Sequence, residues 1–500
     1  MNEQNDKVFD LYRPLRNKLR NYNLIESLFL VWSYSRNYTF NYSIPPEVEL
    51  PNGFSPSMDM NNRRLYGVNE FELEFLTREF ILHCHTRKDK KSILKKAHFG
   101  KIVNYLRSDL DNGLHELFDR GKILLDSHRW SHRQFKWQIG YDRSDILRYH
   151  KIFSDPKVDA LITKMTGLSV NEILLVGFYT FSISANVFRN KYPITSNSTA
   201  VSQVMFDKFF SLFSMTIEEA QKSIKETYRM DETILYSFNP LTAKPILIYK
   251  NTFICPLHLL LFWQITNGLY YFICNEPEFN SVFGDSFEKY IGEVLTDVVN
   301  NPSFNIYKEQ IYGKQVKKSS DWIITDSSSI IFIECKSKRM TLASKSELEV
   351  ENGLNNDLEK MATFIVQVYK TYLDYKSNKY PEITFNSNLL FIPIIVTLET
   401  WFINYNLILP QMVRSLVQKK LEDLNIDVEI IIKHPYQILS CEEFELDIQI
   451  INKIGGRKFA ELHQNKQIKT FKDGFQYEEI FKGHFDSTFI KPLEKLKDSI

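Results

Sequence analysis

The chain has 500 residues, with 62 lysines and arginines against 61 aspartates and glutamates, so its formal net charge is +1. A chain of this length is larger than one hydrophobic core usually supports, and two or three domains are expected. The near-neutral charge excludes a globally basic nucleic-acid-binding protein, so any recognition of phosphate has to come from local patches.

The N-terminus and the cysteines favour a cytoplasmic protein. Residues 1–7 are polar and charged and lack the apolar run of a secretory signal. The five cysteines show no CxxC spacing, which indicates neither a disulfide framework nor a zinc ribbon. His83 and His85 flank Cys84, and His128 and His132 follow, but a buried cysteine between two histidines explains this pattern better than a zinc site.

Residues 1–235 are predicted to form a mainly helical region that binds substrate, senses a signal or contacts a partner protein or a second copy of the chain. Residues 86–151 hold 16 lysines and arginines against 8 aspartates and glutamates, with aromatic residues between them. Cations that neutralise phosphates and rings that stack on bases are common nucleic-acid contacts. The candidates are Arg129, Arg133, Lys136 and Arg143. Solvated helix faces around an aromatic core are the alternative.

Two apolar segments bear on whether the chain crosses a membrane. Residues 253–273 contain no charged side chain and are long enough to span a bilayer, and residues 173–188 are similar. Polar residues interrupt the first segment, so a helix buried between domains is expected and no membrane partner is predicted. Just before it, residues 245–249 and 252–255 flank a Lys-Asn turn as in a β-hairpin, which would lead into a second domain at residues 236–450.

Residues 284–298 have the pattern of an amphipathic helix that carries an acidic residue near a later site. Phe287, Ile291 and Leu295 recur at a spacing of four, and Glu288 lies beside this apolar stripe. Residues 305–312 follow as a predicted strand.

The most informative segment, residues 320–336, has the pattern of a β-hairpin that carries Asp321, Glu334 and Lys336. Alternate residues of a strand share a face, so Glu334 and Lys336 project together. If residues 327 and 328 form a two-residue turn, Asp321 lies directly opposite Glu334. A turn longer by one residue would shift this register.

Two carboxylates and an ammonium group in this arrangement can build a metal-dependent phosphodiesterase site. Mg²⁺ is usually held by one or two carboxylates together with waters and substrate phosphates, a role that suits Asp321 and Glu334, and Mn²⁺ could replace it. A bound divalent cation lowers the pKa of a water and neutralises charge on the phosphate. Lys336 would hydrogen-bond the attacking water as a compact point charge, which an arginine would replace poorly. A solvated strand end with the same residues is the alternative.

The order of these elements resembles the PD-(D/E)xK, or restriction-endonuclease-like, nuclease superfamily: a helix with a glutamate, a strand, and then a hairpin with Asp and Glu-x-Lys. The resemblance covers about residues 240–450 and implies a mixed α/β sheet flanked by helices. It assigns the metal ligands to Asp321 and Glu334, the catalytic lysine to Lys336 and a supporting helix acid, acting on the metal directly or through water, to Glu288. Ser320 replaces the proline of the motif, and Cys335 occupies its variable position, where packing is the expected role.

The segment after the hairpin supplies further candidates. Lys338 and Arg339 could contact nucleic acid, and residues 357–376 have the apolar stripe of a helix that covers a sheet. Gln367 lies off this stripe. Members of the superfamily often place a glutamine near the active site on this helix, although an ordinary solvent-facing glutamine is the alternative.

The remaining residues complete the predicted α/β domain. Residues 389–398 and 428–432 are apolar runs typical of buried strands, with a helix at about residues 407–424 between them. Residues 451–500 are expected to form a helical C-terminal appendage.

These patterns together predict a Mg²⁺- or Mn²⁺-dependent nuclease with DNA as the favoured substrate. The resemblance adds restriction, repair and antiviral defence against phages as settings. Two alternatives stay open: a catalytically silent scaffold that binds nucleic acid or protein, and an RNA nuclease. The sequence has no G-x-x-x-x-G-K-[ST] motif, so movement driven by a nucleoside triphosphate would need a separate partner.

Overall fold

The computed structural model describes residues 3–50, 67–87, 90–117, 123–139, 143–191, 201–231, 233–341, 345, 353–406 and 408–465. The described residues divide into two compact units, the first built from residues up to 123 and 133–275, the second from residues 124–132 and from 276 onward. The division follows residue 275 rather than residue 235, where the sequence predicts the boundary. The segment between the two positions contributes strands and helices to the first unit.

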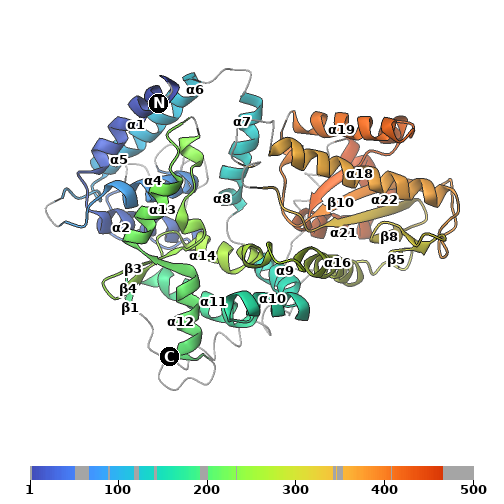
Figure 1. The fold of residues 1–500 in the computed structure, drawn as a ribbon, viewed down its shortest axis with the longest axis horizontal. Coiled ribbons are helices and arrows are strands. Elements are labelled where there is room, and N and C mark those ends of the chain that lie inside the picture. The colour runs from blue at the N-terminus through green and yellow to red at the C-terminus, as the bar shows by residue number, and fades with distance from the viewer. Residues whose placement is uncertain are drawn as a thin grey trace. The chain divides into compact units, whose positions relative to one another are not determined.

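The first unit is mainly helical, as predicted, and its helices differ greatly in length (Figure 1). Along the chain they are α1 (Glu3–Leu19), α2 (Leu24–Phe40), α4 (Glu70–His83), α5 (Lys96–Asn104), η1 (Tyr105–Asp111), α6 (Asn112–Leu117), η3 (Ser131–Phe135), α8 (Lys136–Ile139), α9 (Arg143–Phe153), α10 (Pro156–Thr166), α11 (Val170–Asn186), α12 (Gln203–Phe213), α13 (Ile217–Thr227), η4 (Ile234–Tyr236), η5 (Pro240–Thr242), α14 (His258–Ile265), η6 (Asn267–Leu269) and α15 (Tyr270–Ile273). Several begin with a capping box, in which a side chain such as Ser169 binds a free backbone N–H of the first turn and a glutamate binds back.

The predicted hairpin before residue 256 is confirmed, but it belongs to the first unit. β3 (Ile246–Tyr249) pairs with antiparallel β4 (Thr252–Ile254), and Lys250 and Asn251 have φ angles of 47° and 57°. Positive φ at both turn residues matches the twist of the flanking strands. β1 (Asn190–Lys191) and β2 (Ser214–Thr216) extend this hairpin to a four-stranded sheet in the order β1-β4-β3-β2.

Residues 253–273 do not form one long helix, so that prediction is wrong. The segment contains the end of β4 and the short helices α14, η6 and α15, because Thr266, with φ −105° and ψ −101°, ends α14. All residues of α14 are buried in the first unit, as expected of a core segment. Among the described residues no single helix combines the length and apolarity needed to cross a membrane, and α10 with α11 would meet these criteria only as a pair bent by 64°.

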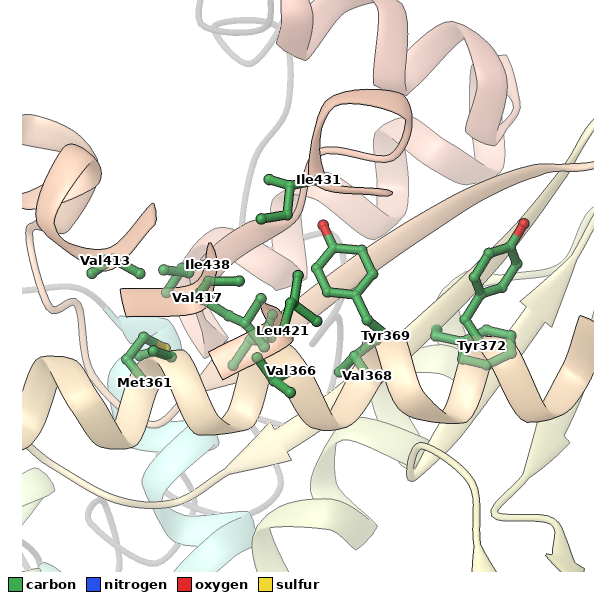
Figure 2. Close-up of a cluster of buried hydrophobic side chains, with 14 of the residues drawn as sticks. Met361, Val366, Val368, Tyr369, Tyr372, Val413, Val417, Leu421, Ile431 and Ile438 are labelled. Atoms are coloured by element: carbon green, nitrogen blue, oxygen red, sulfur yellow. The ribbon is translucent and has the colours of Figure 1, made fainter. Parts of the chain in front are cut away.

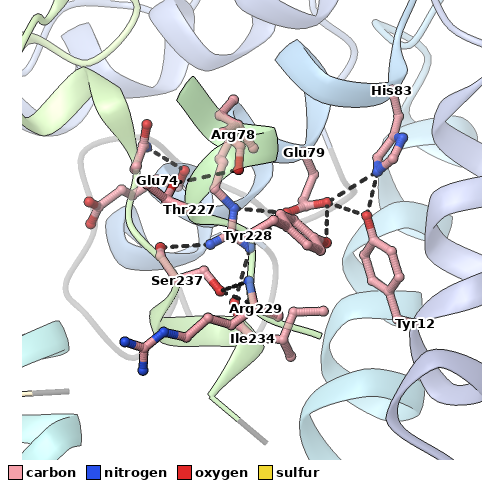
Figure 3. A network of polar contacts seen from close by, with 12 residues as sticks. Tyr12, Glu74, Arg78, Glu79, His83, Thr227, Tyr228, Arg229, Ile234 and Ser237 are labelled. Atoms are coloured by element: carbon pink, nitrogen blue, oxygen red, sulfur yellow. Dashed lines mark hydrogen bonds and ion pairs between the residues drawn. The ribbon is translucent and has the colours of Figure 1, made fainter. Parts of the chain in front are cut away.

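A network of buried charged and phenolic side chains holds α1 and α4 to the segment that follows α13 (Figure 3). Arg78 and Glu79 are 1% and 0% exposed, and Nη2 of Arg78 lies 2.7 Å from Oε1 of Glu79. Nη1 of Arg78 donates to the carbonyl oxygen of Ser237, while Tyr12 and Tyr228 donate to Oε2 of Glu79. Both buried charges are therefore paired and hydrogen-bonded, which is the condition for tolerating them in a core.

The second unit is built on a five-stranded mixed sheet in the order β11-β10-β9-β8-β5. The strands are β5 (Asn305–Lys308), β8 (Trp322–Thr325), β9 (Ser329–Lys336), β10 (Leu390–Thr397) and β11 (Gln437–Ser440). β10 is parallel to β9 and β11, whereas β8 is antiparallel to β5 and β9. The strand predicted at residues 389–398 is thus confirmed as a central one, and it is buried along almost all of its length.

Helices cover both faces of this sheet (Figure 1). The helices of the second unit are α7 (Ile123–Trp130), α16 (Phe279–Val298), α18 (Leu354–Lys376), η7 (Ile403–Tyr405), α19 (Leu409–Asp423), α20 (Glu429–Lys433), α21 (Cys441–Ile454) and α22 (Gly456–Gln464). Of these, α16, α18, α21 and α22 contact the sheet directly. The apolar sides of α18 and α19 meet over one face of the sheet (Figure 2). Phe332 and Phe391 of the sheet belong to the same buried cluster. On the other face, Gly292 of α16 lies against Trp322 of β8, and Gly456 of α22 lies against β9. Side chains at even positions of β9 therefore face α18.

Three predicted elements differ from the structure. Residues 305–312 are split between β5 and β6 (Ile311–Tyr312), which pairs with β7 (Lys317–Lys318) in a separate two-stranded sheet. Residues 428–432 lie mostly in the short helix α20 instead of a strand, because the Asp427 side chain accepts the Glu429 N–H and Glu429 pairs with Lys433 at 2.8 Å. In the predicted appendage, α22 packs on the sheet and is part of the second unit.

Candidate functional site

The predicted hairpin and its register are confirmed. β8 and β9 are antiparallel with Trp322 opposite Ile333, and the turn between them contains two residues closed by a backbone hydrogen bond of 3.0 Å. One position beyond this pair, Asp321 lies opposite Glu334. The two carboxylates thus lie on neighbouring strands at one end of the hairpin, on the face covered by α18.

Glu334 is the buried centre of the site, with 1% of its surface exposed. Its Oε1 accepts hydrogen bonds from Nζ of Lys336 at 2.6 Å and from Nε2 of Gln367 at 2.8 Å. Ser320 lies close enough to lower the pKa of Glu334 slightly, but no hydrogen bond of normal geometry reaches the buried Oε2 from the described residues. Burial, and then the charge of Asp321, raise the pKa of Glu334 to about 7.

Lys336 is a charged donor in a largely enclosed place. Burial acts to lower the pKa of Lys336, but the charge and hydrogen bond of Glu334 outweigh it, and the net shift is upward. Its ammonium group lies 5.0 Å from the ring centre of Phe364, three residues before Gln367 on α18. Phe364 is not among the site residues predicted from the sequence. Its spacing from Gln367, which places both on one side of the helix, is the signal that could have identified it.

Asp321 is held by the backbone of the opposite strand. Its Oδ2 accepts the N–H of Cys335 at 2.6 Å, and among the described residues no hydrogen bond reaches Oδ1. Burial raises the pKa of Asp321 despite this hydrogen bond and the nearby charge of Lys336. Burial, followed by the charges of Asp321 and Glu288, raises the pKa of the Cys335 thiol well above its ordinary value, so the thiol stays neutral.

Glu288 is brought to the hairpin by a close contact between α16 and β8. The indole N–H of Trp322 donates to the carbonyl oxygen of Glu288 at 3.1 Å, and a Cβ at Gly292 would lie 2.1 Å from the Trp322 ring. Burial, and then the charge of Asp321, raise the pKa of Glu288 to about 7. The charge of Lys318, also absent from the residues predicted from the sequence, acts to lower the pKa of Glu288.

The donor set fits a divalent cation held by two carboxylates. The pKa values of Asp321, Glu334 and Glu288 are all raised, and the charge of Asp321 contributes to the rise at both glutamates, so these carboxyl groups lie near one another where positive charge is scarce. The oxygens without hydrogen bonds, Oδ1 of Asp321 and Oε2 of Glu334, are the ones available to a cation. The described residues contain no group of three or more His, Cys, Asp or Glu arranged around a metal position.

The basic candidates of residues 123–143 are not presented as one exposed row. Arg129 is 2% exposed, which argues against direct contact with nucleic acid. The Arg133 guanidinium lies over two aromatic rings, and the exposed Lys136 has its ammonium group 3.8 Å from the ring centre of Trp263. The side chain of Arg143 lies outside the described residues. These contacts favour the alternative interpretation, in which the charged side chains lie around an aromatic core, over a row of nucleic-acid contacts.

The basic candidates after β9 have internal partners as well. Nζ of Lys338 lies 3.3 Å from the buried carboxylate of Asp357, and Arg339 is 6% exposed. Lys338 thus balances a buried aspartate at the start of α18, and the burial of Arg339 argues against its direct contact with a phosphate backbone.

The histidine and cysteine pattern gives no metal site in the part of the chain that the structure describes. His83 bonds to Tyr12, and burial lowers the pKa of His83 to about 4. All five cysteines are free thiols, as expected from their spacing. No protein-family model, curated protein or solved structure matches this chain. The geometry of the site therefore carries the functional argument alone.

Proposed function

We propose that this chain is a Mg²⁺-dependent nuclease of the PD-(D/E)xK type, acting on DNA, with its site at Asp321, Glu334 and Lys336. The observation that carries the proposal is the buried carboxylate of Glu334, which lies opposite Asp321 and is bonded by both Lys336 and Gln367. A buried carboxyl with a raised pKa and an unbonded oxygen is costly to the fold, which favours a functional reason for its presence.

Each side chain has a defined task in this reaction. Asp321 and Glu334 would hold the cation, which supplies a water of lowered pKa and neutralises charge on the phosphate. Lys336 stays charged and donates a hydrogen bond to the attacking water, and Gln367 fixes Glu334 in place. The proton released as the water oxygen bonds to phosphorus would pass to Glu288, whose pKa of about 7 suits this role, and the phosphorus–oxygen ester bond would break. The leaving oxygen is protonated by solvent.

Isosteric variants test the site without emptying it. Asp321→Asn keeps an oxygen for the Cys335 N–H, and Glu334→Gln keeps an acceptor for Lys336. Each should reduce cleavage by more than about 100-fold, because charge stabilisation by a bound cation is worth several kcal/mol. The matched control is Glu359→Gln, an equal change at an exposed position of α18, which should leave cleavage unchanged.

Cleavage is measured on duplex DNA, single-stranded DNA and RNA, each with Mg²⁺ or Mn²⁺. Lys336→Ala is added to the three variants above. Cleavage by Asp321→Asn or Glu334→Gln at the rate of the wild type would refute the site. If the wild type cleaves only RNA, the substrate is RNA and not DNA. If the wild type cleaves none of them, the scaffold alternative takes its place.

A further inference from the structure

We propose that the hairpin of β6 and β7, residues 311–318, binds the sugar–phosphate backbone of a nucleic acid beside the bond that is cleaved. The inference rests on the proposed function, because it names the element that would position the substrate of that same site. It is carried by the anchoring of the hairpin, the composition and exposure of its tip, and its distance from Asp321.

The base of the hairpin is fixed to the second unit. Tyr312 is 6% exposed, and its hydroxyl donates to Asp374 at 2.7 Å. The backbone N–H of Ser319 donates to the carbonyl of Gln310, and the N–H of Gln310 donates to the Ser319 hydroxyl. The Gln310 side chain also donates to Glu382 at 2.9 Å. The direction in which the tip projects is therefore defined.

The tip is exposed and combines apolar with cationic side chains. Residues 313–318 are all exposed, and Val316, at 66%, is as exposed as any large apolar side chain among the described residues. Ile311 is 57% exposed. Lys314 and Lys317 have no ion pair within the described part of the chain. Lysines on either side of an apolar tip are complementary to a nucleic-acid strand, whose phosphates attract cations and whose sugars and bases offer apolar contacts.

Val316 has a backbone conformation that the turn itself does not favour. Its φ angle is 52°, in the left-handed region, where a β-branched residue is an outlier. Gly313 begins the turn with φ 73°, and its carbonyl accepts the Val316 N–H at 3.2 Å. Glycine or asparagine would suit position 316 better, so the turn does not explain the valine, whereas contact of its side chain with a ligand does.

The hairpin is adjacent to the candidate site in sequence, and the charge of its last residue, Lys318, acts on the acidic residues of that site. Lys318 is three residues before Asp321, so their Cα atoms are at most about 11 Å apart, or about three base-pair rises of DNA. The ion pair with Glu309, at 2.8 Å, orients Lys318, whose charge acts on Asp321 and Glu288. Phosphates held by Lys314 and Lys317 would thus be neighbours of the scissile one.

Binding and cleavage by hairpin variants of the full chain test this inference. Binding is measured in the Glu334→Gln background, with labelled duplex DNA, single-stranded DNA and RNA over a range of salt concentrations. Lys314→Ala and Lys317→Ala should each lower the slope of log affinity against log salt by about 0.9 and weaken binding about fivefold to tenfold at 0.1 M salt. Val316→Gly should weaken binding without lowering the denaturation midpoint, because it relieves an unfavourable φ angle.

The matched control is Leu424→Ala with Lys419→Ala, an exposed apolar residue and an exposed lysine near the end of α19, which should leave binding and cleavage unchanged. Wild-type affinity and salt slope in the three hairpin variants would overturn the inference while leaving the proposed function intact. Loss of cleavage in the hairpin variants alone, with full activity in Asp321→Asn, would overturn the proposed function instead. A wild-type chain that binds no nucleic acid would overturn both and make the tip a protein contact.

Discussion

Replacement of Gly292 by alanine tests how closely α16 must approach β8 for Glu288 to reach the site. A Cβ there would lie 2.1, 2.5 and 2.9 Å from three ring atoms of Trp322, all shorter than the ordinary van der Waals contact distance of 3.4 to 4 Å. Trp322 is 8% exposed, and its indole N–H donates to the Glu288 carbonyl. The ring therefore cannot turn aside without breaking that bond and moving into packed side chains.

The size of the effect follows from two opposing contributions. Overpacking costs about 1–3 kcal/mol, and the rigidity of the ring at Trp322 places Gly292→Ala near the upper value. Alanine favours the helix over glycine by about 1 kcal/mol. We expect the second unit to lose about 2 kcal/mol of stability, and cleavage to fall because α16 must shift away with Glu288.

Gly284→Ala is the matched control on the same helix. A Cβ at Gly284 meets nothing within 4 Å, so this variant should gain up to about 1 kcal/mol. The two units need not unfold together, so stability is best followed locally, by hydrogen exchange in peptides from α16 and β8 during urea titration. Equal stability and equal exchange in the two variants would refute the close packing of α16 on β8, and with it the position of Glu288.

Two further predictions concern buried charge. In the metal-free protein, Glu334 binds its proton more tightly when folded, so stability should fall as pH rises from about 4.5 to about 7, by about 3 kcal/mol from this group. Glu334→Gln should remove that part of the pH dependence, and parallel curves for the two proteins in urea unfolding across this range would contradict the buried position of the carboxyl. Glu79→Leu should destabilise the first unit by about 3–5 kcal/mol, because it leaves the charge of the buried Arg78 unpaired. Lys95→Ala, which breaks an exposed pair with Glu49, should cost far less stability. Similar losses in these two variants, by the same measurement, would show that the Arg78 network does not hold the unit together.

The sequence by itself predicts those features of the site that depend on local geometry. The two-residue period of a strand places Glu334 and Lys336 on one face, and the length of the turn places Asp321 opposite Glu334. The stripe of α18 and the central strand β10 follow in the same way from the spacing of apolar residues. In each case the determining residues are close in sequence, so the pattern is complete before any tertiary contact forms.

Local patterns mislead where a few polar contacts outweigh a hydrophobic run. Four of residues 428–432 are β-branched and apolar, as in a buried strand. The Asp427 side chain nevertheless starts a helical turn there, and Lys433 pairs with Glu429 within it. The boundary between the units is a second example. The hairpin of β3 and β4 was expected to lead into the α/β unit, but pairing with β1 and β2, distant in sequence, assigns it to the helical one.

Only the tertiary structure decides the environment of each site residue. That Gln367 and Lys336 share one oxygen of Glu334, and that Arg129 is buried, depends on contacts between segments far apart in the chain. The raised pKa values of Glu288 and Glu334 have the same main origin, because the burial of both carboxyl groups arises only when α16 and α18 pack on opposite faces of the sheet. Sequence determines which groups can meet on a strand, while long-range packing determines their solvation and hence their chemistry.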